Sequence, residues 1–410
     1  MKIWKSILAT ASVFYLGVAA SEIEVEIGSA WNDELDMLIT RQTAPVSSND
    51  EPLPCNGFPE YRDLPVNHFF WLGAHNAGSH DVPKFKQQAA NVKEPHACQY
   101  KSQDRTITEM LTDGLRFLQV NVCKTKNDKL SLCSPTGVQM YDTLFQDFID
   151  EVLDFIRMYP QQIIMVHVSA SKKPKQPVTA EALEGAIDEV CKVHTDRTLG
   201  TDEFKRHECP FIYTHPFAAR PWPTMGELIN YDPDMPQWEG DGQHVGVQSQ
   251  LVLTYDDRLA SSLGQKSHYF SQPFWESGFK VDQQLKDVDD NVRELCKKSG
   301  ALQLNAFLPE TTVDCNSHLN EKFYTPAVID RLLLSKDVCD FNNLPSTTYF
   351  SGITVDCYEQ HLPFLLNLQR QMVAINYAKL NGRKVDLKPS PVKEEKLDTQ
   401  SPYHHERDEL

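Results

Sequence analysis

Two residues far apart in the sequence, His75 and Asp356, have the side-chain types needed for acid–base chemistry. His75 follows the apolar run 69–73 and precedes Asn76, and Asp356 follows the branched run 349–355. A carboxylate beside an imidazole tunes its proton affinity and orientation, as general acid–base catalysis requires. Together with an amide, this pair is suited to hold a phosphate or a sugar. We predict that His75 and Asp356 are catalytic and that Asn76 binds substrate.

The segments that must bring these residues together alternate between strands and helices. Branched or aromatic runs predict strands at 69–73, 115–122, 163–168, 211–213, 251–255, 302–308 and 349–355. Helices are predicted at 106–112, 179–194, 326–334 and 362–380, and a capping box is predicted at 224–227. Repeated strand and helix units favour a parallel α/β sheet, and about eight possible strands favour a TIM-type barrel. In such barrels the site lies where the strands end, as His75 and Asp356 do.

A further helix is predicted to begin at Thr143 and to end before Pro160. Thr143 and Gln146 have the spacing of a capping box. Apolar residues follow at helical spacing, which predicts that one face packs on the sheet: Leu144, Phe148, Val152, Phe155 and Ile156.

The two ends of the chain carry address signals. Lys2 and Lys5 precede a short apolar run that ends in small residues, which is typical of a secretory signal peptide at 1–20. The last four residues, 407–410, read Arg-Asp-Glu-Leu and resemble an endoplasmic reticulum retention signal. We therefore predict a soluble protein of the endoplasmic reticulum lumen whose C-terminus binds the retrieval receptor.

Composition defines the remaining segments and excludes some partners. Residues 21–50 are predicted to be a flexible acidic and polar segment, 51–382 the barrel, and 383–410 a polar tail. The formal net charge of −17 argues against nucleic acid, which binds clustered Lys and Arg. The ten cysteines suggest disulfides, and Cys123 and Cys133 are placed to pair across a hairpin.

Several motifs occur in order along the chain: Cys55-Asn-Gly57, Leu72-Gly-Ala-His-Asn-Ala-Gly-Ser79, Gly114-Leu-Arg-Phe-Leu118, Leu132-Cys-Ser134, Ile163-Ile-Met-Val166, Arg220-Pro-Trp-Pro-Thr-Met225 and Ile353-Thr-Val-Asp-Cys-Tyr-Glu359. In order and spacing they resemble the PLC-like phosphodiesterases, the group built on the phosphatidylinositol-specific phospholipase C X domain. The resemblance covers roughly residues 55–380. It implies a distorted TIM-type (β/α)8 barrel, the PLC-like phosphodiesterase fold, in which two histidines act as base and acid on a phosphodiester.

The resemblance also shows where this chain departs from the family. His75 matches the first catalytic histidine, but Ser134 stands where the second is expected. Gln119 and Asn121 are neutral where metal-using relatives carry carboxylates, and Asn121 also replaces the arginine that metal-free bacterial relatives use against phosphate. Hard cations prefer charged oxygen ligands, so we predict no metal and no other cofactor. Gln119, Asn121 and Ser134 are predicted to bind substrate, and so is Lys172.

Two functions remain open at this stage. The first is a phosphodiesterase that acts on a phosphoinositide or related lipid head group by metal-independent acid–base chemistry, with weakened or altered catalysis. The second is an inactive pseudoenzyme that serves as a luminal binding protein. Candidates for the missing acid are His80, His167 and His215, of which His215 is favoured, and Trp222 and Trp275 are candidates to line the substrate mouth. A glycosidase would need a close carboxylate pair, and Asp256 and Asp257, as neighbours in sequence, point apart.

Overall fold

The structure is a computed structural model that describes residues 54–80, 100–125, 127–134, 143–171, 177–199, 209, 211–215, 221–229, 250–263, 267–280, 297, 300–306, 313–314 and 347–383. All of them belong to one compact unit of the chain, Thr40–Val385. Several predictions lie outside the described residues: the signal peptide, the segment 21–50, the helix 326–334, the tail beyond Arg383, Lys172, Cys98, Cys296, Cys315 and Cys339.

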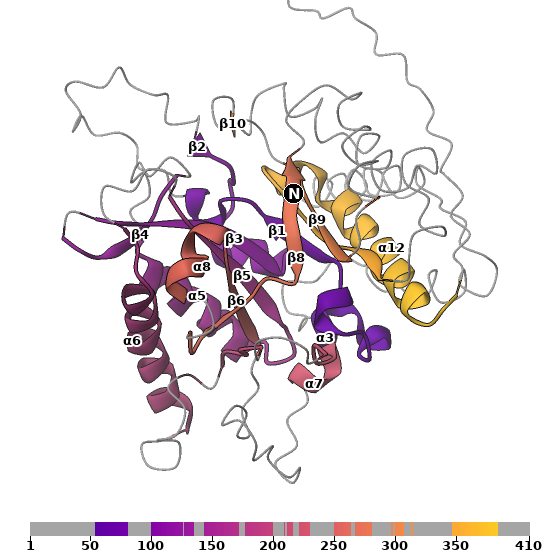
Figure 1. The fold of residues 1–410 in the computed structure, drawn as a ribbon, viewed down its shortest axis with the longest axis horizontal. Coiled ribbons are helices and arrows are strands. Elements are labelled where there is room, and N and C mark those ends of the chain that lie inside the picture. The colour runs from indigo at the N-terminus through magenta and orange to yellow at the C-terminus, as the bar shows by residue number, and fades with distance from the viewer. Residues whose placement is uncertain are drawn as a thin grey trace, which may run out of the picture. The chain divides into compact units, whose positions relative to one another are not determined.

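The core of this unit is a curled parallel sheet (Figure 1). Its parallel strands are β1 (Trp71–Ala74), β3 (Phe117–Lys124), β5 (Ile164–Ala170), β6 (Leu251–Tyr255), β7 (Phe270–Ser271), β8 (Trp275–Lys280), β9 (Gly300–Ala306) and β11 (Thr348–Val355). The short strand β4 (Leu130–Leu132) runs antiparallel to β3, and β2 (Tyr100–Lys101) pairs separately with β10 (Val313–Asp314).

The order of the strands is that of a barrel opened at one seam. Across the sheet they follow β7-β6-β5-β3-β1-β11-β9-β8, so each parallel strand lies beside its neighbour in sequence and the first pairs with the last. Among the described residues, no ladder joins β7 to β8. The predicted α/β fold, a distorted barrel of the TIM type, is confirmed in this form.

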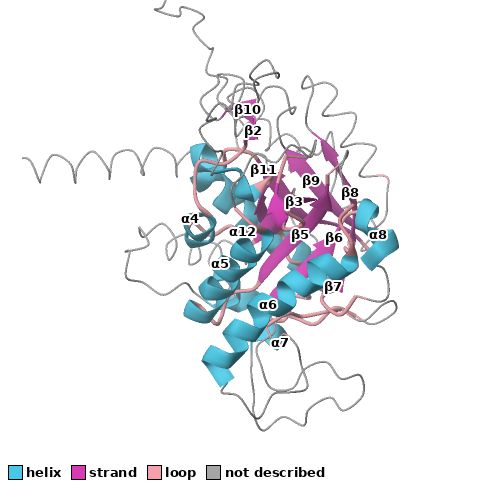
Figure 2. Ribbon diagram, turned by 90° about the vertical axis from the view of Figure 1, so that its left-hand side faces the viewer, coloured by secondary structure: helices cyan, strands magenta, loops and turns pink. Residues whose placement is uncertain are grey.

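Helices cover the outer side of the sheet. The long ones are α5 (Phe145–Met158), α6 (Ala180–Leu199) and α12 (Leu362–Leu380), and the short ones are α4 (Ile107–Thr112), α7 (Met225–Ile229) and α8 (Asp257–Leu263). Figure 2 shows α5 and α6 in front of β5 and β6. The apolar face of α5 is buried, as predicted from Phe148, Val152 and Ile156. None of the helices in the described part is long and apolar enough to cross a membrane.

The remaining named segments are short turns. The segment labelled α3 (Pro54–Gly57) is a left-handed turn, because Cys55 and Asn56 have φ values of 53° and 59°. Single turns of 3-10 helix are η1 (Pro59–Tyr61), η2 (Val66–His68), η3 (Ala77–His80) and η6 (Tyr358–His361). η3 and η6 follow β1 and β11, and so they lie next to the predicted site.

The capping box predicted at Thr143 is wrong. The carbonyl of Thr143 accepts hydrogen bonds from the backbone of Leu132 at 3.1 Å and the hydroxyl of Ser131 at 3.2 Å. Leu144 forms a bridge with Ser131, so this segment stays extended beside β4. Leu144 is therefore the N-cap, and the helix begins at Phe145, one residue later than predicted. The box predicted at Thr224 and Glu227 is confirmed by two reciprocal bonds of 2.7 and 3.2 Å.

The strand predicted at 211–213 is also wrong. Ile212 forms only an isolated bridge with Leu251. The next positions of that edge of β6 pair with β7, through Leu253 and Phe270, which leaves no room for a longer ladder there. Neither β7 nor β8 was predicted, because two-residue and interrupted strands leave little periodicity in the sequence.

One glycine is required by close strand packing. A Cβ atom added to Gly352 would lie 2.5 Å from the carbonyl oxygen of Trp71 on the paired strand β1. We expect Gly352→Ala to lower the free energy of unfolding by about 1–3 kcal/mol, because the backbone must move. Urea denaturation followed by tryptophan fluorescence measures this change.

Gly185 on α6 is the matched control, because an added Cβ atom would meet no atom within 4 Å. Gly185→Ala should raise the free energy of unfolding by roughly 0.5–1 kcal/mol, since alanine is the better helix former. Equal effects of the two substitutions would contradict the tight β1–β11 contact.

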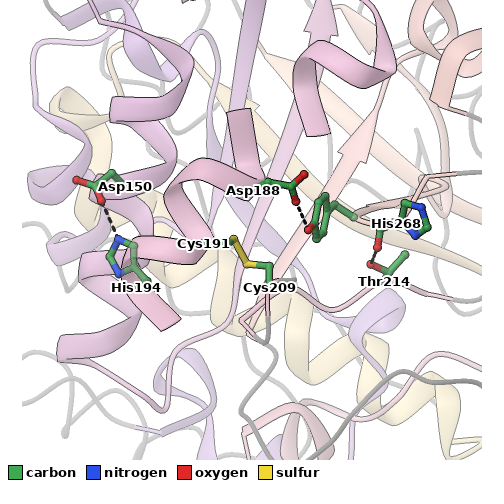
Figure 3. Close-up of a disulfide and its surroundings, with 8 residues drawn as sticks. Asp150, Asp188, Cys191, His194, Cys209, Thr214 and His268 are labelled. Carbon is green, nitrogen blue, oxygen red and sulfur yellow. Dashed lines mark hydrogen bonds and ion pairs between the residues drawn. A yellow bond between two sulfur atoms is a disulfide. The ribbon is translucent and has the colours of Figure 1, made fainter. Parts of the chain in front are cut away.

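A disulfide joins α6 to the segment that leads toward β6 (Figure 3). It links Cys191 to Cys209. On the same helix, buried His194 contacts Asp150 of α5 through Nε2 at 2.8 Å, and Asp188 accepts a hydrogen bond from the hydroxyl of Tyr269. These contacts fix α6 to α5 and to the region just before β7.

Cys123 and Cys133 lie together on the β3–β4 hairpin, as predicted, but as free thiols. The thiol of Cys133 donates a hydrogen bond to the sulfur of Cys123. This bond lowers the pKa of Cys123 and raises that of Cys133. Their pairing as a disulfide stays a prediction.

Candidate functional site

His75 and Asp356 meet at the carboxyl ends of two neighbouring strands. β1 pairs with β11 through Ala74 and Val355, and the backbone N–H of His75 donates to the carbonyl of Val355 at 3.0 Å. The next residue on each strand then projects the same way, and His75 Nδ1 lies 2.8 Å from Asp356 Oδ1. The side chains are only 8% and 0% exposed. Residues separated by 281 positions thus form one buried dyad.

The dyad has a defined direction for proton transfer. An ionised carboxylate only accepts hydrogen bonds, so the Nδ1–H of His75 donates to Asp356. This tautomer leaves Nε2 as the atom that takes up a proton. The carboxylate orients the ring and stabilises the imidazolium that would form.

Gln103, which was not predicted from the sequence, holds the backbone of the dyad in place. Gln103 Nε2 donates to the carbonyls of both His75 and Val355, each at 2.8 Å. Gln103 is itself held because its backbone N–H, like that of Ser102, donates to Ser79 Oγ, at 3.1 and 2.9 Å. Its partners are backbone groups distant in sequence, so no local pattern could have identified it.

Asn76 and Asn121 are brought together beside the dyad. Asn76 has a φ of 52°, the left-handed conformation that asparagine tolerates better than most residues. Its side-chain oxygen accepts from Asn121 Nδ2 at 3.3 Å, and both residues are buried. Two of the predicted substrate-binding residues therefore flank His75.

A polar row crosses the sheet at the level of His75. Gln119 on β3 is in register with His167 on β5, and His167 is in register with Thr254 on β6. Because Ala74 pairs with Leu118, His75 continues the row beside Gln119. In parallel strands, residues in register point to the same face. The buried Oε1 of Gln119 has no hydrogen-bond partner among the described residues.

This row lies on the concave side of the curled sheet. The ring of Trp275 on β8 contacts Phe117 on β3 and His167 on β5, at centroid distances of 5.4 and 5.5 Å. β8 is not a neighbour of β3 or β5 in the sheet, so only side chains inside the curl can meet in this way. Gln119 shares the face of Phe117 and therefore points inward too.

His167 is neutral at physiological pH. Burial lowers its pKa to about 4, and the positive charge of Arg258 lowers it further in the same direction. Nδ1 of His167 lies 3.0 Å from the hydroxyl oxygen of Thr254, which donates to the carbonyl of Val166 at 3.3 Å. Thr254 therefore accepts from Nδ1–H, and Nε2 of His167 is an acceptor.

Ser134 reaches the site through the β3–β4 hairpin. The backbone N–H of Cys133 donates to the carbonyl of Asn121 at 2.9 Å, which places Ser134 beside the end of β3. Its side chain is buried, at 1% exposure. The position at which the resemblance predicts a second histidine thus lies beside β3 and holds a hydroxyl.

Residues 89–235 match the PI-PLC X family model, described as PI-PLC X 1. This part of the chain is similar to the PI-PLC X family. The matched region contains Gln119, Asn121, Ser134 and His167; it begins after His75 and ends before Asp356.

One curated relative and two solved structures are also similar to the chain. The PI-PLC X domain-containing protein 1 of Arthroderma benhamiae is 24% identical over 224 residues, which are 55% of this chain and 59% of that protein. The phosphatidylinositol-specific phospholipase C of Listeria monocytogenes is 9% identical, with a TM-score of 0.47 and coverage of 78% and 98%. A variant of the Staphylococcus aureus enzyme is 12% identical, with a TM-score of 0.44 and coverage of 77% and 96%.

The fold does not bring every candidate residue to the dyad. His215 contacts the hydroxyl of Tyr213 at 2.9 Å and stacks on Trp222 at 4.0 Å, and the rings of Phe274 and Trp275 separate this pair from His167. His80 lies in η3, and Asp256 pairs with Arg258. His167, rather than the favoured His215, is the candidate that lies in the row of His75.

The described residues contain no cluster of three or more His, Cys, Asp or Glu side chains able to hold a metal ion. The expectation of metal-independent chemistry stays a prediction.

Proposed function

We propose that this protein is a phosphodiesterase that acts on a phosphoinositide or a related lipid head group by metal-independent acid–base chemistry, with weakened catalysis. The observation that carries the proposal is the buried 2.8 Å contact between His75 and Asp356 at the strand ends of a PI-PLC X-like fold. In this reaction Nε2 of His75 takes a proton from an attacking hydroxyl, while Asp356 stabilises the imidazolium.

The proposed weakness of catalysis has a residue-level cause. A leaving alkoxide needs a proton donor, and a serine hydroxyl at position 134 cannot donate one near neutral pH. His167 does not replace the lost histidine as an acid, because its pKa of about 4 leaves it unprotonated at pH 7. The departing alkoxide must then take its proton from water, and the proton held on His75 neutralises the hydroxide that this leaves.

A second function is favoured by the same substitution. Ser134, Gln119 and Asn121 are neutral, so the site can bind a phosphate ester without turning it over. In that case the protein is a luminal pseudoenzyme that binds a lipid head group. For either function we propose residence in the endoplasmic reticulum lumen, from the predicted signal peptide and the Arg-Asp-Glu-Leu terminus.

The two functions are separated by one assay. The purified protein is incubated with phosphatidylinositol vesicles and with a glycosylated inositol lipid, with and without EDTA, and release of the phosphorylated head group is measured. Turnover that persists in EDTA supports the metal-independent phosphodiesterase. Turnover abolished by EDTA contradicts it, and binding of the vesicles without turnover favours the pseudoenzyme.

A further inference from the structure

A cation, Arg258, follows the last strand of the polar row and lies outside the motifs that carry the family resemblance. Arg258 lies in the first turn of α8, directly after β6. The backbone N–H of Asp256 donates to the carbonyl of Val168 at 3.1 Å, so the chain stays beside β5 up to this point. Arg258 therefore occupies the carboxyl end of the sheet, the end that also carries His75 and Asp356.

The guanidinium of Arg258 is held by one carboxylate. Its Nε donates to Asp256 Oδ2 at 2.6 Å, and Nη2 reaches the same oxygen at 2.5 Å. Asp256 Oδ1 accepts from the backbone N–H of Leu259 at 3.2 Å, which fixes the carboxylate in turn. Arginine has five N–H donors, so this contact leaves others for a ligand. The side chain of Arg258 is 39% exposed, and that of Asp256 14%.

The charge of Arg258 acts on the interior of the curl. It lowers the pKa of buried His167, and it opposes the rise in the pKa of Cys133, the neighbour of Ser134.

We propose that Arg258 is the phosphate-binding cation of this site, and the proposal rests on the function proposed above. It takes the part of the arginine that is absent at Asn121, from a strand two places along the sheet. His75 and His167 lie on strands separated only by β3, so their backbones are about 10 Å apart. A phosphate ester fits this span, with its anionic oxygens toward Arg258 and its reacting hydroxyl toward His75.

Gln119 provides a separate indication that a ligand fills the row. Its buried Oε1 is unpaired among the described residues, and it stands between His75 and His167. Buried acceptors without a partner cost free energy, and a ligand hydroxyl or a bound water in the row would remove that cost. A ligand with both a phosphate and a hydroxyl, such as a phosphorylated polyol, satisfies Arg258 and Gln119 together.

The test measures binding without turnover. Calorimetric titration of the full-length protein with inorganic phosphate and with glycerophosphoinositol gives the two affinities, and phosphatidylinositol vesicles supply the same group within a lipid. Arg258→Gln should weaken binding of glycerophosphoinositol about 10- to 100-fold, since charge-assisted bidentate bonds are lost. The affinity of Arg258→Lys should lie between those of the wild type and Arg258→Gln, because lysine keeps the positive charge but cannot make the bidentate contact of a guanidinium.

A second readout reports where the anion sits. In an NMR titration, Arg258→Gln should raise the pKa of His167, because a nearby positive charge has been removed. Glycerophosphoinositol should raise that pKa in the wild-type protein and have little effect in the variant. Arg157→Gln is the control, since Arg157 also pairs with a carboxylate and is 32% exposed but lies on α5.

Equal affinity in Arg258→Gln and the wild type, or an unchanged pKa of His167, would overturn the proposal. Binding of vesicles but not of glycerophosphoinositol would also overturn it, because contact with the membrane and not the phosphate would then account for the affinity. If the wild type binds in this Arg258-dependent manner but turns nothing over, the inference stands and the proposed phosphodiesterase fails.

Discussion

Replacement of His75 by alanine is expected to lower the rate of phosphodiester cleavage by about 10²–10⁴-fold, because the side chain that takes up the proton is removed. Asp356→Asn should also lower the rate strongly, since an amide no longer stabilises the imidazolium or selects the Nδ1–H tautomer. Release of the phosphorylated head group from phosphatidylinositol measures both effects as initial rates under saturating substrate.

The pair of substitutions contains its own control for folding. Asparagine has nearly the same shape as aspartate. The near-ultraviolet circular dichroism spectrum of the Asp356→Asn protein should therefore match that of the wild type. A double variant should lose little more than the more damaging single variant, because the two groups act as one unit. Independent, multiplying losses would show that His75 and Asp356 do not work together.

Ser134→His is expected to raise the cleavage rate by a factor approaching 10², the lower range for a restored general acid. The gain should be largest below about pH 7, where an imidazole of ordinary pKa is protonated. Ser134 is 1% exposed, so the larger ring must displace neighbours, and overpacking costs about 1–3 kcal/mol of stability. Rates are therefore compared at a temperature where both proteins remain folded.

Ser134→Asn is the matched control, because it adds bulk and a polar group but no titrating nitrogen. It should leave the rate unchanged or lower it. A folded Ser134→His protein with no gain would mean that the loss of a proton donor at this position does not limit catalysis. A gain in both variants would point to packing instead of proton transfer.

Many of the strands and helices could be predicted from local sequence patterns. β6 and α12 have the bounds predicted from the apolar runs at 251–255 and 362–380. These segments are long or strongly apolar, and their signals depend on residues close together in sequence. β7, β8 and the true start of α5 were missed, because they are decided by partners on other strands, as Leu144 and Ser131 show.

The sequence by itself determined the chemistry available to this protein: an imidazole after one strand, a carboxylate after another, and a serine where the resemblance expects a second histidine. Only the tertiary structure decided which of these groups meet. The pairing of the first strand with the last puts His75 Nδ1 2.8 Å from Asp356. The strand register places His167 in the row, and the turn after β6 brings Arg258 to its edge. Contacts of this kind join residues up to 281 positions apart. They arise from strand order and register across the whole sheet, which no local pattern in the sequence records.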